Sequence, residues 1–550
     1  MKFSVVALAL GLIPLISAKR SGQHVGKKLP EIKRSFSPRA AAPAVPQPKK
    51  RQAPSFLTDA TKSGLSHRAQ EQRPTNFDLE FAVNGSAIPE VDFDIGESYA
   101  GLMPISNATD ASELYFWFFP SINPAASSEI LIWLNGGPGC SSLEGFLQEN
   151  GPFLWQYGTF KPIQNQWSWT NLTNMVWVEQ PVGTGFSQGT PTATSEKDVA
   201  EQFLGFFKNF VDTFAMQGYT VYIAGESYAG YYVPYIADAM FNANDTDYYN
   251  ISSIMIYDPS LSYDVVQQHI PVTSFVDFWG PLLDLNASFV ADLHAQADAC
   301  GYTAFMDDYL VYPPKGPLPT PPNYDLSNDT CDTFDAVFNA ISLVNPCFDI
   351  YQVATTCPLL WDVLGFPGSF DYVPDGAFIY FNRTDVQKAI NAPVQEWLEC
   401  TSVDVFVNAT DNSDPSALSV LPGVIEKADR VIIGHGLLDM ILLWNGTLLA
   451  TQNMTWNDAQ GFSTPPSQWD DFYVPYRTSY ENQLGSLAGA GVMGQYHTER
   501  GFTLVTVDLS GHMIPQYAPS AAYRQLEFLL GRIPTLGTVG PFTTMQGESY

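Results

Sequence analysis

Short apolar segments that end abruptly in polar or glycine-rich turns recur along the chain. They are apolar throughout and rich in β-branched residues, which is typical of strands buried on both faces of a mostly parallel sheet. The segments with this pattern are 130–134, 175–178, 221–224, 254–257, 430–433 and 503–507. Helical candidates lie between them, at 200–210 and 386–390. This alternation predicts an α/β fold with functional residues at the carboxyl ends of the strands.

The beginning of the chain and one internal segment depart from this pattern. Residues 1–18 combine Lys2 with a short apolar run and end in Ser-Ala, which predicts a secretory signal peptide rather than a membrane anchor. Residues 19–51 are rich in proline, alanine and basic residues, which predicts a propeptide removed after Arg51. Residues 263–372 interrupt the alternation with a proline-rich stretch and four of the six cysteines.

Acidic residues dominate the chain once the predicted propeptide is removed. The first 51 residues hold 11 of the 26 Lys and Arg but 1 of the 56 Asp and Glu, which leaves 15 basic against 55 acidic residues. Such a surface excludes nucleic acids and anionic membranes as partners. Protonation of carboxylates relieves its self-repulsion, which favours an acidic compartment, although the charge is equally consistent with solubility alone.

Glycosylation sequences and an even number of cysteines agree with secretion. The Asn-x-Ser/Thr sites are Asn84, Asn107, Asn171, Asn244, Asn250, Asn286, Asn328, Asn382, Asn408, Asn445 and Asn453. Six cysteines suggest three disulfides. None of them has the spacing of a metal site, so we expect neither bound zinc nor a cofactor.

Ser227 is the candidate nucleophile. It follows the strand candidate 221–224 in Gly-Glu-Ser-Tyr-Ala, between Gly225 and Ala229, and a helix-like run comes next. A serine at such a turn has a strained backbone and an exposed hydroxyl, and its neighbours must be small because strand and helix approach closely. Taken alone, the pattern is equally consistent with an ordinary turn serine.

An acid and then a histidine must follow Ser227 along the chain if it belongs to an α/β-hydrolase triad. His512 comes directly after the strand candidate 503–507, whereas His497 precedes that strand and so belongs at the opposite end of the sheet. Asp439 follows the strand candidate 430–433, and its rival Asp429 precedes it. We therefore predict a triad of Ser227, Asp439 and His512, with His435 as a nearby loop residue.

The glycine-rich turn after segment 130–134 is the candidate oxyanion site. Its sequence, Asn-Gly-Gly-Pro-Gly, offers backbone N–H groups where an oxyanion forms. We predict that the amides of Gly137 and Tyr228 are the two donors. A phosphate-binding loop or dinucleotide site is excluded because neither GK[ST] nor GxGxxG follows.

Four segments together resemble the serine carboxypeptidase family of the carboxypeptidase Y type: 133–142, 179–187, 225–230 and 511–515. They come in the family's order, and the likeness covers about residues 75–535. The resemblance implies an α/β-hydrolase core, split into 52–262 and 373–550, with 263–372 as a mainly helical cap. It also implies release of C-terminal amino acids from peptides at acidic pH through an acyl-enzyme.

The resemblance further assigns a clamp for the substrate's terminal carboxylate, formed by Asn135, Gly136, Glu149 and Glu226. Two neighbouring carboxyls cannot both ionise cheaply, so one stays protonated and donates a hydrogen bond to another carboxylate. Deprotonation at higher pH would then repel the peptide terminus. The alternatives are a surface role for Glu149 and a turn role for Glu226.

Two departures from the family pattern lead to further expectations. Leu442 stands where carboxypeptidase Y has a cysteine in the acyl-side pocket, so thiol sensitivity should be absent there. Glu144 and Gln148 stand where that relative is more apolar, and we expect Glu144 to favour polar or basic C-terminal residues. Within the implied layout, we expect disulfides Cys140–Cys400, Cys300–Cys357 and Cys331–Cys347, the last two nested in the cap.

Two other functions remain compatible with the sequence. An esterase or acyltransferase uses the same triad, and a non-catalytic binding protein can occupy the same scaffold. The sequence leaves open an extracellular or vacuolar destination, and it leaves open whether the chain forms a homodimer.

Overall fold

The computed structural model describes residues 80–358, 360–365, 378–477 and 489–545. The predicted signal peptide and propeptide lie outside these residues. None of the helices in the described part of the chain combines the length and the apolar character needed to span a bilayer.

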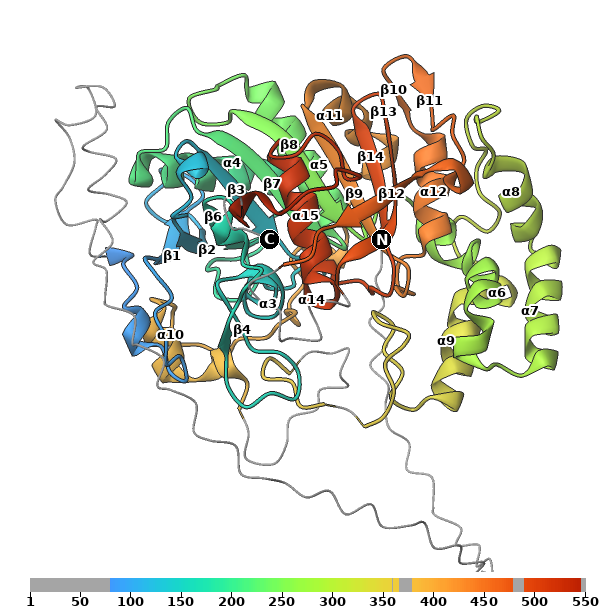
Figure 1. Ribbon diagram of the computed structural model, residues 1–550, viewed down its shortest axis with the longest axis horizontal. Coiled ribbons are helices and arrows are strands. Elements are labelled where there is room, and N and C mark those ends of the chain that lie inside the picture. The colour runs from blue at the N-terminus through green and yellow to red at the C-terminus, as the bar shows by residue number, and fades with distance from the viewer. Residues whose placement is uncertain (1–79, 359, 366–377, 478–488, 546–550) are drawn as a thin grey trace, which may run out of the picture. The chain divides into compact units, whose positions relative to one another are not determined.

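Six neighbouring parallel strands form the centre of a ten-stranded sheet in the described part of the chain (Figure 1). In sheet order they are β6 (Met175–Glu179), β3 (Glu129–Leu134), β7 (Thr220–Glu226), β8 (Ile251–Tyr257), β9 (Arg430–Gly436) and β14 (Phe502–Val507). Each contains one of the six strands predicted from sequence. The continuous apolar pattern was a reliable signal because these strands are buried on both faces.

Antiparallel strands complete both edges of the sheet. They are β1 (Tyr99–Pro104) and β2 (Glu113–Phe119) on one side, and β13 (Gly491–Glu499) and β12 (Asp470–Val474) on the other. The sequence pattern did not predict these strands. β13 alternates buried and more exposed residues, which is the pattern of a strand with one solvated face.

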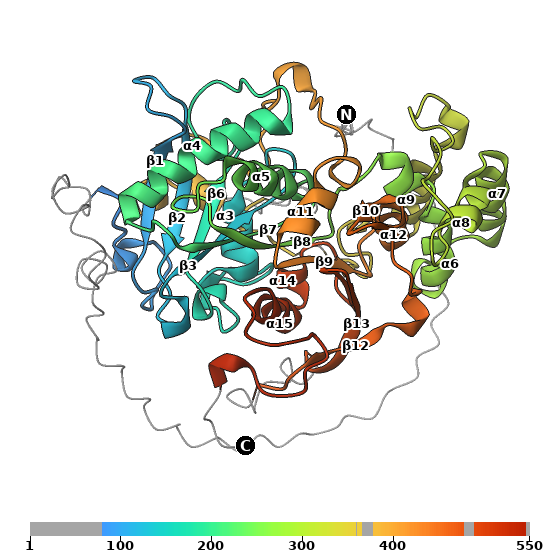
Figure 2. The ribbon, with the colours of Figure 1, turned by 90° about the horizontal axis from the view of Figure 1, so that it is seen from above.

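Helices cover both faces of the sheet. Figure 2 shows α4 (Glu196–Phe214), α5 (Ala229–Ala243) and α11 (Leu421–Lys427) on one side, and α14 (Ile514–Tyr517) and α15 (Pro519–Leu529) on the other. α4 contains the predicted helix 200–210, and α10 (Thr384–Ala389) overlaps the predicted helix 386–390. In α4, Phe203, Phe206, Phe210 and Phe214 recur at helical spacing and are buried.

Four helices occupy the segment that interrupts the alternation: α6 (Val272–Leu283), α7 (Ala287–Ala299), α8 (Tyr302–Tyr309) and α9 (Thr333–Val344). Both views place them beside α12 (Trp444–Asn453) (Figures 1 and 2). Val276 of α6 and Val337 of α9 share an apolar cluster with Leu438 and Met440. This insertion therefore packs against the two residues that flank Asp439.

The shorter elements lie mainly in the connecting segments. They are α3 (Ser142–Glu144), β4 (Phe153–Leu154), β5 (Ile163–Gln164), β10 (Thr455–Trp456) and β11 (Ala459–Gln460). Strands β4 and β5 pair with each other, as do β10 and β11.

The disulfides confirm one predicted pairing and correct the other two. Cys140 is bonded to Cys400, as expected. The predicted pairs Cys300–Cys357 and Cys331–Cys347 are wrong, because the structure joins Cys300 to Cys331 and Cys347 to Cys357. Gln296, near the end of α7, donates a hydrogen bond to the carbonyl of Thr330, which brings Cys300 against Cys331. The two bridges therefore close successive local loops, and neither loop lies inside the other.

The predicted glycosylation sites differ in accessibility. Exposed sites are Asn84, Asn107, Asn244, Asn286, Asn328 and Asn408. By contrast, the side-chain amides of Asn382 and Asn445 donate hydrogen bonds to the Trp397 carbonyl and to Ser274. Attachment of a glycan at either of these two asparagines would disrupt a packed hydrogen bond.

Candidate active site

The turn between β7 and α5 has the geometry predicted for a nucleophile elbow. Ser227 has φ of 60°, in the left-handed region that is strained for a residue other than glycine. Its backbone amide donates to the carbonyl of Tyr257 at 3.0 Å, while its side chain remains partly exposed. A Cβ atom at Gly225 would lie 2.7 Å from that of Ala229, so strand and helix approach as closely as predicted.

His512 and Asp439 form a buried hydrogen-bonded pair. The Nδ1 atom of His512 lies 2.8 Å from Oδ2 of Asp439. The other carboxylate oxygen of Asp439 accepts from the amide of Ile441 at 2.8 Å, and the amide of His512 donates to the carbonyl of Tyr351. The Nε2 atom of His512 is buried without a hydrogen-bond partner among the described residues. Serine–histidine hydrogen bonds are often long in unliganded enzymes and tighten when substrate binds.

The rival residues lie elsewhere on the sheet. Asp429 is exposed beside the start of β9, where it accepts a hydrogen bond from Ser252. His497 belongs to edge strand β13, and its Nε2 lies 3.2 Å from Glu499. Position relative to a strand thus separates Asp439 and His512 from these rivals. The prediction that His435 is a loop residue is wrong, because His435 lies within β9.

The glycine-rich turn after β3 lies directly against the elbow. A Cβ atom at Gly136 would lie 2.5 Å from the Tyr228 amide nitrogen and 2.7 Å from the Ser227 Cβ. Gly137 has φ of 110°, which a residue with a side chain rarely adopts. The disulfide from Cys140 holds the end of this turn. The two predicted donors, Gly137 and Tyr228, thus lie on adjoining turns.

Three carboxyls converge beside the same turn: Glu144, Glu149 and Glu226. One oxygen atom from each lies within 4.8 Å of the others. The side-chain amide of Asn135 donates to Glu144 at 2.6 Å and to Glu226 at 2.8 Å. Its carbonyl oxygen accepts from the indole of Trp133, which orients the amide toward the carboxyls. The sequence placed Glu149 and Glu226 here, whereas the structure adds Glu144.

A π-helical turn explains why the sequence assigned Glu144 to specificity and not to the carboxylate clamp. Glu144 ends α3, and residues Gly145–Asn150 form a π-helix that carries Glu149. Residues five apart diverge in a regular α-helix, whereas i→i+5 hydrogen bonding brings them to the same face. Sequence spacing alone therefore separated two side chains that the fold brings together.

Burial and mutual repulsion keep protons on this cluster. Burial raises the pKa of Glu149 well above its ordinary value, and the charges of Glu226 and Glu144 raise it further. Burial likewise raises the pKa of Glu226 strongly and that of Glu144 to about 7. The cluster therefore contains neutral carboxyls at acidic pH, and these can donate hydrogen bonds to an incoming carboxylate.

Further acidic residues surround the cluster. The side-chain amide of Gln148 donates to Asp362 at 2.7 Å, and its carbonyl oxygen accepts from Gln516. Burial, and then the charges of Asp362, Glu399 and Glu144, raise the pKa of Tyr157. This side of the candidate site is thus rich in carboxyls beyond the predicted residues.

Comparison with known proteins agrees with this geometry. A model of the family described as serine carboxypeptidase matches residues 89–531. The chain is 56% identical to a probable serine carboxypeptidase from Arthroderma benhamiae, over 97% of each chain. It is 49% identical to serine-type carboxypeptidase F from Aspergillus niger, over 82% of this chain and 87% of the relative. The fold resembles the crystal structure of KEX1(delta)p, a prohormone-processing carboxypeptidase from Saccharomyces cerevisiae, with TM-score 0.64 and 22% identity over 84% of this chain and 99% of that chain.

Proposed function

The chain belongs to the serine carboxypeptidase family and is a serine-type carboxypeptidase, and we propose that it releases single C-terminal amino acids at acidic pH through an acyl-enzyme. The observation that carries the proposal is the protonated carboxyl cluster beside the nucleophile elbow. An endopeptidase or a general esterase has no need of buried neutral carboxyls at this position.

The first step is attack by Ser227 on the scissile carbonyl. His512 takes the Ser227 proton at Nε2 and then delivers it to the leaving amine, which departs as the free amino acid. Asp439 holds the Nδ1–H of His512 and stabilises the imidazolium that forms. Water then repeats the sequence, with His512 as base, and releases the shortened peptide from the Ser227 ester.

The amides of Gly137 and Tyr228 stabilise the oxyanion in both steps. Their turns lie in van der Waals contact through Gly136, so the two donors are held before substrate binds. Preorganised donors lower the barrier because they need no reorientation as charge develops. Loss of one such donor typically raises the barrier by about 3 to 4 kcal/mol.

Asn135, the Gly136 amide, Glu149 and Glu226 bind the substrate's terminal carboxylate, and Glu144 joins them. At acidic pH a neutral carboxyl donates a hydrogen bond to that carboxylate. As pH rises through the raised pKa values, the donor is lost and a negative charge takes its place. Affinity for free-acid substrates should therefore fall with rising pH.

Three disulfides and the similarity to carboxypeptidase Y homologues indicate the secretory pathway. An acidic compartment, vacuolar or extracellular, fits the pH dependence of the carboxylate clamp. The partners are peptide or protein C-termini.

A pair of matched substrates tests the proposal. Processed protein is incubated between pH 4 and 7 with a blocked dipeptide and with its C-terminal amide. We expect faster turnover of the free acid, most strongly at the acid end, and no turnover by Ser227→Ala. Equal turnover of acid and amide would contradict the clamp, and activity that survives in Ser227→Ala would contradict the nucleophile.

A further inference from the structure

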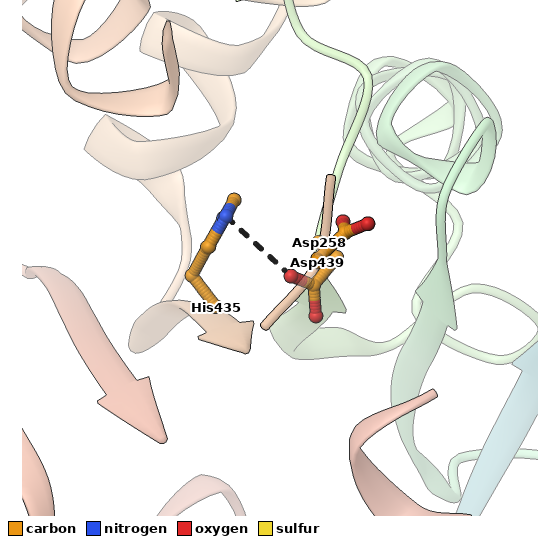
Figure 3. Close-up of side chains that lie close together, drawn as sticks. All are labelled: Asp258, His435 and Asp439. Atoms are coloured by element: carbon orange, nitrogen blue, oxygen red, sulfur yellow. Dashed lines mark ion pairs between the residues drawn. The ribbon is translucent and has the colours of Figure 1, made fainter. Parts of the chain in front are cut away.

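A second aspartate lies beside the predicted triad acid. Asp258 follows β8 directly and is fully buried, with φ of 41°. Its Oδ1 atom accepts from the Gly436 amide at 2.9 Å and lies 3.5 Å from Nε2 of His435. One side-chain atom from each of Asp258, His435 and Asp439 lies within 4.8 Å of the others. Figure 3 shows the imidazole ring and the two carboxyls grouped at the ends of their strands.

His435 does not supply the positive charge that two ionised aspartates would need. Burial and the nearby charge of His512 lower the pKa of His435 to about 3. Its Nδ1 atom contacts Thr447 Oγ1 at 3.4 Å. The ring is therefore a neutral, fully buried neighbour of Asp258 at the working pH.

The two aspartates differ in what else they contact. Burial raises the pKa of Asp439, whereas His512 on its far side and the Ile441 amide lower it and so favour its ionised form. Burial, and then the charge of Asp439, raise the pKa of Asp258 well above its ordinary value. The proton that the two carboxyls share therefore resides on Asp258. Its Oδ2 atom accepts no hydrogen bond from the described residues.

We propose that Asp258 is a positioning residue whose neutral carboxyl donates a hydrogen bond to Asp439 and holds that carboxylate in the orientation that His512 requires. The inference rests on the proposed roles of Asp439 and His512. Asp258 does not contact the substrate. It acts through Asp439, and His435 packs behind it and excludes water.

Several other titratable groups face this array. They are Glu226 at the end of β7, Tyr257 at the end of β8, Asp349 in the segment before Tyr351, and Glu144 in the carboxyl cluster. Protonation of the carboxyl cluster affects the binding of substrates that carry a free terminal carboxylate. An ester substrate without this carboxylate is therefore used, so that the pH profile does not include that effect.

The test compares Asp258→Asn and Asp258→Leu with the full processed enzyme on such an ester. The acid limb of kcat/KM against pH reports protonation of the essential base in the free enzyme. Asparagine tolerates the left-handed backbone, stays neutral and can still donate to Asp439. We therefore expect a kcat within about threefold of wild type and an acid limb displaced by less than about 0.3 pH units.

Asp258→Leu fills the site but cannot donate a hydrogen bond. We expect kcat per titrated active site to fall by about 10- to 100-fold. The acid limb should also move to higher pH. Without the hydrogen bond from Asp258, the Asp439 carboxylate attracts the His512 imidazolium more strongly. Asp429→Asn makes the same chemical change as Asp258→Asn at an exposed site beside β9, and it should leave both readouts unchanged.

Two results would overturn the inference. An acid limb that moves down by about half a pH unit or more in Asp258→Asn would show that Asp258 carries a charge. A wild-type kcat and pH profile in Asp258→Leu would show that the donated hydrogen bond has no role. If the leucine variant does not fold, the asparagine profile alone decides. An inactive wild type, or an active Ser227→Ala, would instead refute the proposed function.

Discussion

Two groups of buried carboxyls lie on either side of Ser227 in the sheet, and they differ in whether a neighbouring side chain can balance a negative charge on them. Glu144 and Glu149 follow β3, and Glu226 ends β7. The neutral amide of Asn135 donates to Glu144 and Glu226. Asp258 and Asp439 follow β8 and β9, and Asp439 has His512 as a partner that can become cationic.

This difference determines which charge each group attracts. Without a cation, the glutamate cluster retains protons and becomes a donor surface for an anion. With His512 on one side, the aspartate pair keeps a negative charge at the place where, in the proposed mechanism, an imidazolium develops. Burial raises the pKa in both groups, and the neighbouring side chain decides whether the result is a binding site for a carboxylate or support for a base.

The largest effect on activity should come from removal of the negative charge of Asp439. In Asp439→Asn we expect kcat to fall by about 10⁴-fold with little change in KM, because the amide no longer fixes the tautomer and charge of His512. Steady-state assays, with the active-site concentration determined by titration, measure kcat and KM. Asp429→Asn is the matched control. A fall of less than about tenfold would contradict the assignment of Asp439.

Changes in the glutamate cluster should affect substrates selectively. In Glu149→Ala we expect kcat/KM for a blocked dipeptide at pH 5 to fall by about 10- to 100-fold, since a hydrogen bond to a charged group is lost. The C-terminal amide of the same dipeptide should change little. Glu149→Gln keeps a donor that does not titrate, so its KM for the free acid should rise less steeply with pH than that of the wild type.

The exposed change Glu396→Gln serves as the control for both variants. Equal losses on the acid and the amide, or an unchanged pH dependence in Glu149→Gln, would refute the clamp.

Stability should follow the same carboxyls with a definite sign. Burial raises the pKa values of Glu144, Glu179 and Asp349 to about 7. The folded state therefore binds more protons than the unfolded state between pH about 4.5 and 7, so stability is greatest below this window and is lost as pH rises through it. We expect Tm to fall by about 5 °C between pH 5 and 8.

Thermal unfolding followed by intrinsic fluorescence checks this pH dependence. Glu179→Gln should flatten the slope, because it removes a carboxyl whose pKa burial raises to about 7. A Tm that rises from pH 5 to pH 8 is the opposite of what the raised pKa values require.

The smallest effect should concern the released amino acid. Asp362 and Glu399 lie on this side of the site, and Glu144 adds a negative charge there as pH rises through its raised pKa of about 7. Above that pH, a leaving residue with a cationic side chain should be favoured. In Glu144→Gln we expect the ratio of Lys to Leu release from matched peptides to fall by about two- to fivefold above pH 7, where Glu144 is ionised in the wild type, and to change little at pH 5. Release of Phe relative to Leu is the internal control. An unchanged Lys to Leu ratio would show that Glu144 does not affect which amino acid is released.

The parallel strands of the central sheet, and the candidate residues that follow them, could be predicted from the sequence alone. Six apolar segments predicted the six parallel strands, because a strand buried on both faces must be apolar throughout. Chain order after Ser227, together with position after a strand, predicted Asp439 and His512, and the structure places these two in hydrogen-bond contact. Edge strands such as β13 carry polar residues on a solvated face, and their weaker pattern was missed.

Only the tertiary structure decided how the carboxyls group. A π-helical turn aligns Glu144 with Glu149, and adjacent strands bring Asp258 to Asp439 from far along the chain. The disulfide partners of Cys300 and Cys347 likewise depended on how the inserted helices pack. Sequence specifies local pattern and strand ends, whereas proton sharing and cross-links depend on distances between side chains, which packing alone sets.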